Sequence, residues 1–427
     1  MKVIPSIRCY LDVSSVHCWF AFERLLKQNN VKLDFVPVHV ASIMSTIGHK
    51  MPYYEKALRD YNFYDITVMS NYYGVEARLP EHALERLSNT GTFNATRFLS
   101  LVEELEPDKT ESVWRATFCR LWRDNKEIHK DSDFREIADT CNLSNSTLDS
   151  LNDDKWTFKV MQNNDEAITQ GCFGVPWIKA EVEDGSECFF GADRIPSQRK
   201  IIVSVSTNMS GKAVIDLYFD VISPYAWIGF ESLIRYAPKL PAELRFRPFF
   251  LGAVMKATGN QPPAMVPAKA RYGQKDMEYA SKYWGVPLNQ PSDFFSSIIG
   301  RSTVVPLRFL TALERKNPEQ VPAMARALWM RIWSRDLPIH DEASVREAAS
   351  EAGLSPHLVD ILWKESNTTE IKQLLKTRTD EAIESGAFGA PWIVLRKPGP
   401  TRKSFLRKRQ TPRILVLDYL HTPSPVS

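Results

Sequence analysis

Cysteine is scarce in this chain and unevenly placed. All six cysteines lie between Cys9 and Cys188, and none follows in the rest of the 427 residues. No two are spaced as Cys-x-x-Cys, so the sequence offers neither a zinc ribbon nor the paired thiols of a self-sufficient disulfide oxidoreductase. This usage excludes a disulfide framework for the whole chain and favours a reducing compartment.

Long apolar runs and a strong excess of one charge are also missing. The sequence contains no run of about 18 apolar residues, the length needed to cross a membrane. Residues 1–13 are typical of a strand rather than a signal peptide or presequence. The net charge of +3 argues against a nucleic-acid surface. With 44% hydrophobic and 25% charged residues, the chain is predicted to be globular, to contain two domains and to handle small molecules.

An internal repeat determines the domain organisation. CYLDVSSVHCWFAFERL, from Cys9, matches LYFDVISPYAWIGFESL, from Leu217, at an offset of 208. RLWRDNKEIH over RIWSRDLPIH continues the match at 211, and DEAITQGCFGVPWI over DEAIESGAFGAPWI at 215. Such a collinear series indicates two copies of one domain. We assign them to residues 1–205 and 206–427, with the boundary in the polar stretch near 203–213.

Each copy is predicted to be an α/β domain interrupted by helices. In the second copy, VIDLYFDVI is typical of a buried strand, and Ser223-Pro224 introduces a helix with apolar residues three and four apart. LRFRPFF gives a second strand, residues 263–375 have a helical pattern, and GAFGAPWIVL returns to a strand. A sheet, a helical insertion and a sheet again define the expected architecture.

Ser223 is the most informative position, because it lies where the first helix begins. Unpaired N–H groups and the helix dipole favour an anion there, and a serine hydroxyl can donate to a thiolate. Lowering a thiol pKa from about 8.5 to about 6.5 needs roughly 2.7 kcal/mol, which a charge-assisted hydrogen bond and the dipole can supply together. The alternative is that Ser223 only caps the helix.

A second candidate feature is the FGAPWI motif, in which Pro391 stands at the entrance to a strand. This placement suits a cis peptide whose backbone faces a ligand, although an ordinary trans turn is the more common outcome. A polar residue at the first helix start, followed far downstream by an x-Pro strand, is the layout of a thioredoxin-like fold.

On the motifs DVISPYAWIGFE, VMKATGNQPPAMVPAKARY, VPLRFLTALE, LWMRIWSRDLPI and ESGAFGAPWI, the second copy resembles the kappa-class glutathione transferases over about residues 213–395. The first copy resembles the same family more weakly, over about residues 5–200. The wider family includes glutathione-dependent 2-hydroxychromene-2-carboxylate isomerases and Dsb-type oxidoreductases. The fold implied is two tandem thioredoxin-like domains, each with a helical insertion.

The resemblance also implies a glutathione site in the second copy, with glutathione as co-substrate and no metal. Ser223 would stabilise the thiolate as the catalytic residue. The residues expected to bind the tripeptide are Pro224, Tyr225, Asn260, Lys269, Ala390 and Pro391. Lys269 suits a carboxylate, although an exposed lysine is more often a solvated charge. The implied partners are electrophiles or hydroperoxides, and two fused copies could pair as an internal pseudo-dimer or a homodimer.

The first copy departs from the family at its thiol site. Ser15 stands over Ser223, but Val16 and His17 replace the Pro-Tyr pair, His49 stands over Asn260, and Leu58 stands over Lys269. Loss of the lysine and the amide predicts a degenerate or structural copy. Its FFGADR stretch nevertheless keeps the family segment for the γ-glutamyl end, at Ala192, Asp193 and Arg194. His17 beside Cys18 suggests a thiol nucleophile, but a buried, inert cysteine is the more common outcome.

The second copy departs at its end, where the expected FFGSDR-like strand and closing helix are missing after WIVLRKPGP. Residues 396–413 instead contain eight Lys or Arg and no acid. Such a tail could bind nucleic acid or anionic lipid, but the abrupt loss of similarity favours an alternative exon or a shifted reading frame.

The expected function is a glutathione transferase, with glutathione peroxidase activity as an extension. The alternatives are an isomerase of the 2-hydroxychromene-2-carboxylate type and a non-catalytic glutathione-binding protein. A mitochondrial location is favoured over the peroxisome or cytosol.

Overall fold

Two similar α/β units make up the described part of the chain. The computed structural model describes residues 6–29, 31–51, 54–83, 92–182, 185–195, 213–294, 298 and 300–396. We call the unit that ends at residue 195 the first half and the unit that begins at residue 213 the second half. The boundary predicted near residue 205, and the basic tail after Arg396, lie outside the described residues.

The first half contains a four-stranded sheet in the order β2-β1-β3-β4. Strands β1 and β2 are parallel, whereas β3 is antiparallel to β1 and to β4. Between β2 and β3 the chain forms the helical insertion. The elements are β1 (Ser6–Leu11), α1 (Val16–Leu25), β2 (Lys32–Pro37), α2 (Val40–Thr46), α3 (Lys56–Tyr73), α5 (Phe93–Leu105), η2 (Pro107–Lys109), α6 (Thr110–Trp122), α7 (Asp131–Cys141), α8 (Asn145–Asp149), α9 (Lys155–Thr169), β3 (Trp177–Val182), β4 (Gly185–Phe190) and η3 (Ala192–Arg194).

The second half repeats this order up to its third strand, and its described sheet has the order β6-β5-β7. Strand β5 pairs in parallel with β6 and antiparallel with β7. The elements are β5 (Ala213–Phe219), α10 (Pro224–Tyr236), η4 (Ala237–Lys239), β6 (Ala242–Pro248), α11 (Leu251–Thr258), η5 (Pro263–Met265), α12 (Pro267–Trp284), α13 (Val304–Lys316), η7 (Pro318–Gln320), α14 (Val321–Trp329), the π-helix η8 (Met330–Ser334), α15 (Glu342–Glu351), α16 (Pro356–Ser366), α17 (Thr369–Glu384) and β7 (Trp392–Arg396).

The fold class predicted from the repeat is therefore confirmed, and the sequence patterns explain most elements. Strand β5 is buried along nearly its whole length, as expected for a central strand covered on both faces. Helix α10 begins with Pro224 at its first position, where the missing N–H costs nothing. The helical region is longer than the predicted 263–375, because it begins at Leu251 and ends at Glu384.

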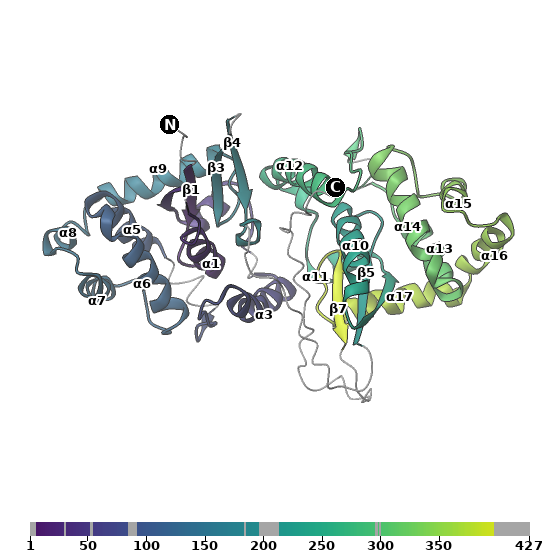
Figure 1. Cartoon of the computed structure of the whole chain (residues 1–427), viewed down its shortest axis with the longest axis horizontal. Coiled ribbons are helices and arrows are strands. Elements are labelled where there is room, and N and C mark those ends of the chain that lie inside the picture. Colours follow the sequence, from purple (N-terminus) through teal and green to yellow (C-terminus); the bar gives the residue numbers. More distant parts are fainter. Residues whose placement is uncertain are drawn as a thin grey trace.

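The two halves contact each other through equivalent helices. Tyr61 on α3 packs against Phe388 and Trp392 of the second half, with ring centroids 5.2 and 6.0 Å away. Tyr272 on α12 packs against Phe173 and Trp177 of the first half, at 5.3 and 5.6 Å. In Figure 1, α3 and α12 lie between the two sheets, whereas α5 to α8 and α13 to α16 lie toward the two outer ends of the molecule. The two sets of contacts are equivalent, because Tyr61 and Tyr272 occupy the same position in the repeat.

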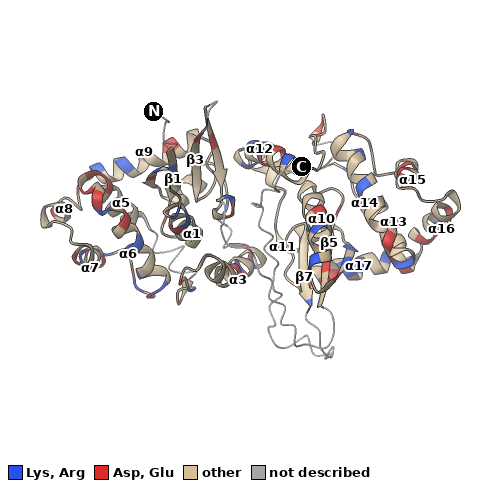
Figure 2. Ribbon diagram, viewed as in Figure 1, with Lys and Arg blue, Asp and Glu red and all other residues tan. Residues whose placement is uncertain are grey.

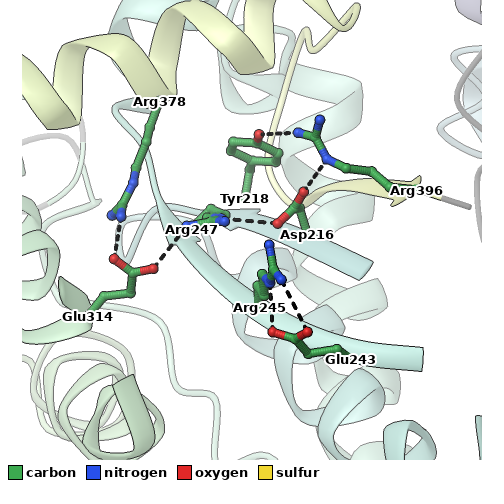
Figure 3. Close-up of polar contacts among 8 residues, drawn as sticks. All are labelled: Asp216, Tyr218, Glu243, Arg245, Arg247, Glu314, Arg378 and Arg396. Carbon is green, nitrogen blue, oxygen red and sulfur yellow. Dashed lines mark hydrogen bonds and ion pairs between the residues drawn. The ribbon is translucent and has the colours of Figure 1, made fainter. Parts of the chain in front are cut away.

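Charged residues of both signs are interspersed along the helices of both halves (Figure 2). A polar network stabilises the sheet of the second half (Figure 3). Asp216 on β5 is almost fully buried and accepts hydrogen bonds from Arg247 on β6 at 3.0 Å and Arg396 on β7 at 2.5 Å. Arg247 continues to Glu314 on α13, which also pairs with Arg378 on α17. The network therefore joins all three described strands to two helices of the insertion.

The strand registers place opposite charges side by side in each half, with the signs exchanged. Arg8 on β1 faces Asp34 on β2 and donates a hydrogen bond to it at 2.8 Å. At the matching place in the second sheet, Asp216 on β5 faces Arg245 on β6.

A buried carboxylate fixes the loop that leads into α10. Asp220 accepts hydrogen bonds from the backbone N–H of Ile222 at 3.1 Å, from the N–H of Leu251 at 3.0 Å and from the hydroxyl of Thr303 at 3.0 Å. Its carbonyl also accepts from the N–H of Ser223. The start of α10 is thus tied to both α11 and α13.

We expect Asp220→Asn to remove a pH dependence of stability. Burial raises the pKa of Asp220 to about 6, whereas an unfolded aspartate titrates near ~3.9. The native state holds the proton more tightly, so this group's contribution to the free energy of unfolding falls as pH rises from about 4 to about 6. Urea unfolding of parent and variant across this window checks the sign. Equal pH slopes for the two proteins would contradict it.

Candidate thiol site

Ser223 lies at the N-cap of α10, as the capping alternative predicted, and its role toward a thiolate stays a prediction. Its Oγ accepts a hydrogen bond from the backbone N–H of Ala226 at 3.1 Å, so it caps the helix. The same hydroxyl donates to the carbonyl of Ala390 at 3.2 Å. The proton is therefore directed across the site toward the residue before Pro391. The hydroxyl can rotate to donate the same hydrogen bond to a thiolate bound beside it, in place of the carbonyl.

The loop before β7 forms the opposite wall of the site. The Ala390–Pro391 peptide is cis, and so is the equivalent Val175–Pro176 peptide in the first half. The more common trans turn is therefore not what the structure contains. Pro391 packs directly on α10, since a Cβ added to Gly229 would lie only 2.8 Å from its Cγ.

Asn260 connects this loop to the turn after α11. Its Nδ2 donates to the carbonyl of Phe388 at 2.7 Å, and its Oδ1 accepts from the N–H of Gln261 at 2.9 Å. The structure thus brings Ser223, Ala390, Pro391 and Asn260 together around one loop. The amide of Asn260 acts here on the protein's own backbone.

The side chain of Tyr225 reaches α12. Its hydroxyl donates to Oδ2 of Asp276 at 3.0 Å. Burial, and next the charge of Asp276, raise the pKa of Tyr225 well above its ordinary value, so the phenol stays protonated and remains a donor. Asp276 also receives Arg194 of the first half, whose NH2 group lies 2.9 Å from Oδ1.

Lys269 lies near the start of α12, and its ammonium group is 5.9 Å from the ring centroid of Phe173 in the first half. Its expected contact with a glutathione carboxylate stays a prediction. Burial lowers its pKa to about 8. Burial and the charge of Lys269 together lower the pKa of His49 in the first half to about 4, which keeps that imidazole neutral. The described contacts therefore direct Lys269 across the interface between the halves.

The first half presents an altered version of the site. Ser15 occupies the N-cap of α1, but its side chain makes no cap hydrogen bond. Nε2 of His17 lies 4.0 Å from Oδ2 of Asp65, on α3. Cys18 is fully buried, and burial raises the pKa of its thiol far above the ordinary value. An unreactive thiol is the result, as the sequence favoured.

The FFGADR stretch of the first half ends in η3, which lies beside the second half. Ala192 is buried and its carbonyl accepts from Arg24 at 3.5 Å. The side chain of Asp193 is 48% exposed, and Arg194 reaches Asp276. Sequence reasoning missed Asp276 and its counterpart Asp65. The repeat carried the signal, because an offset of 211 places Asp65 over Asp276 and His17 over Tyr225 at 208.

Among the residues that the structure describes, no group of three or more His, Cys, Asp or Glu side chains is arranged to hold a metal ion. Over the same ranges, no helix combines the length and hydropathy needed to span a bilayer.

Comparisons with known proteins agree with this fold. A family model described as a DSBA-like thioredoxin domain matches residues 6–203 and 214–408. Glutathione S-transferase kappa 1 of Rattus norvegicus is 40% identical over 192 residues, covering 45% of this chain and 85% of that protein. The Homo sapiens protein of the same name is 36% identical over 191 residues, covering 45% and 84%. A 2-hydroxychromene-2-carboxylate isomerase of Sphingobium xenophagum is 30% identical over 184 residues, covering 42% and 87%.

The chain therefore belongs to the DSBA-like thioredoxin family, and it contains the family's domain twice in tandem. The resemblance to kappa-class glutathione S-transferases, drawn from the motifs alone, is confirmed at 34–40% identity.

We expect Asn260→Ala to destabilise the second half by about 1 kcal/mol, because it leaves the carbonyl of Phe388 without its donor. Asn367→Ala is the matched control, since Asn367 donates to a backbone carbonyl at an exposed position, where water can replace it. Urea unfolding should give a clear loss for the first variant and a change within about 0.5 kcal/mol for the second. Equal losses would contradict the assignment.

Proposed function

We propose that the second half binds glutathione and uses Ser223 to hold its thiol as a thiolate for transfer to an electrophile. The observation that carries the proposal is the placement of the Ser223 hydroxyl. It lies at the positive end of α10 and is directed at Ala390, the residue before the cis-proline. Relatives named glutathione S-transferase kappa support the same chemistry.

Binding would exchange one hydrogen bond of Ser223 for another. The cysteinyl backbone of glutathione pairs with Ala390, and the hydroxyl proton of Ser223 then turns from the Ala390 carbonyl to the sulfur. The N–H of Ala226 continues to donate to Oγ, which polarises the hydroxyl toward the thiolate. Stabilising the thiolate by two pKa units corresponds to about 2.7 kcal/mol, within reach of a charge-assisted hydrogen bond plus the helix dipole.

The thiolate then acts as the nucleophile. In conjugation, its electron pair forms the new carbon–sulfur bond, and the leaving group departs with the electrons of the bond that breaks. With a hydroperoxide, the sulfur attacks the outer oxygen, the O–O bond breaks and an alcohol leaves. A second glutathione then reduces the oxidised sulfur to the disulfide and releases water.

An isomerase activity is the second candidate, and the relative from Sphingobium xenophagum favours it. There the thiolate adds to the substrate, a bond rotates and the thiolate leaves again, so glutathione is not consumed. Product analysis with a 2-hydroxychromene-2-carboxylate separates the two activities. Isomerised product without loss of glutathione supports the isomerase, and a stable thioether supports the transferase.

The test is Ser223→Ala in the full chain. We expect the thiol pKa of bound glutathione, followed by thiolate absorbance, to rise by one to two units, and turnover at neutral pH to fall about 10- to 100-fold. Capping accounts for a further loss of about 1 kcal/mol of stability. Ser223→Thr keeps the hydroxyl and serves as the matched control.

Unchanged turnover in the alanine variant would remove Ser223 from the mechanism. Glutathione binding without turnover in the parent would instead support a binding protein without catalysis. If the parent did not bind glutathione at all, the glutathione proposal would be contradicted.

A further inference from the structure

One polar chain crosses from the first half into the candidate thiol site of the second half. The NH2 group of Arg194 in η3 lies 2.9 and 3.1 Å from the two carboxylate oxygens of Asp276 on α12. Asp276 in turn accepts the hydroxyl of Tyr225 at 3.0 Å. Tyr225 is in the first turn of α10, two residues after Ser223. The contact from the first half thus ends one turn from the proposed thiolate.

The energetics of Asp276 make Arg194 important. The carboxylate side chain is only 6% exposed, and a buried charge without a partner is costly. Arg194 supplies the opposite charge and Tyr225 supplies a neutral donor. If Arg194 were removed, the buried carboxylate of Asp276 would lose its ion pair and would have to move toward water. That movement alters the hydrogen bond that holds the side chain of Tyr225.

The reverse contact is different in kind. Asp65 and His17 occupy the positions of Asp276 and Tyr225 in the repeat. Nε2 of His17 is 4.0 Å from the Asp65 carboxylate, which is longer than a hydrogen bond. Burial raises the pKa of Asp65 and lowers that of His17, so desolvation opposes this ion pair. The sequence after Arg396 carries no counterpart of the FFGADR stretch that delivers Arg194.

We infer that the first half is a permanently attached positioning unit for the second half's thiol site, with Arg194 acting through Asp276 and Tyr225, and that this support runs in one direction only. The inference rests on the proposed function. Of the two domain copies, only the second then has a thiol site that the other copy supports. Arg194 is a positioning residue that does not touch substrate. Covalent fusion maintains the contact, because the partner domain cannot diffuse away.

The experiment compares Arg194→Ala, Arg194→Lys and Arg115→Ala in the full chain. Arg115 is the matched control, since it also forms an ion pair with a carboxylate, but within the first half, with Glu23 at 2.8 Å. We expect Arg194→Ala to raise the thiol pKa of bound glutathione and to lower kcat by about tenfold or more, with a smaller change in KM. Arg194→Lys should recover part of both, because one nitrogen makes both contacts to Asp276.

A double variant distinguishes positioning from general loss of structure. If the unpaired carboxylate causes the defect, Asp276→Asn should make the loss of Arg194 less harmful, so the two changes should not be additive. Hydrogen exchange gives a readout that needs no ligand. Amides of residues 221–230 should exchange faster in Arg194→Ala and at the parental rate in Arg115→Ala. This comparison remains decisive if an alanine variant is poorly stable, because the lysine variant can be measured in the same way.

The outcomes separate this inference from the proposed function. If the parent binds glutathione and Arg194→Ala leaves the thiol pKa unchanged, the positioning role is overturned, even if stability falls. If the parent does not bind glutathione, the proposed function fails. Hydrogen exchange at residues 221–230 then still decides whether Arg194 orders the start of α10, and parental protection in Arg194→Ala would overturn the inference.

Discussion

The rest of the arrangement depends on two reciprocal contacts, in which a tyrosine of each half packs on the other half. Tyr61 of the first half packs on the loop before Pro391, and Tyr272 of the second half packs on the loop before Pro176. Each half therefore packs on the cis-proline loop of the other. Aromatic pairs of this kind add roughly 0.5–1.5 kcal/mol each beyond the area they bury. Because the site loops are also interface loops, movement at the interface and movement at the site are linked.

Much of the fold could be predicted because both copies of the repeat show local patterns of residue type and spacing. The strand leading to Asp220, the serine before a proline at a helix start, and the x-Pro strand each follow from residue type and spacing. Ser223, Asn260 and Ala390 lie together around one loop, as the resemblance implied. Those positions are defined within one half and need no knowledge of how the halves pack.

The remaining features depend on packing between the halves, which local patterns do not encode. An aspartate on a helix, such as Asp276, has the sequence signature of a solvated charge, whereas in the structure it is buried and bonded to Arg194 and Tyr225. Lys269 was expected at the ligand from the family resemblance, and the structure places it near Phe173 and His49 across the interface. Aligning the two copies residue by residue would have paired Asp65 with Asp276, but would not have shown what each contacts.

The exchanged charges in the two sheets bear on how a chain with two similar halves folds correctly. Strand β1 could pair with β6 in the register it uses with β2, and Arg8 would then face Arg245; β5 paired with β2 would place Asp216 opposite Asp34. Like charges directly opposite destabilise a strand pair, whereas both correct pairings match opposite signs. The sheets thus discriminate against strand exchange between neighbouring copies, a characteristic misfolding route of tandem domains.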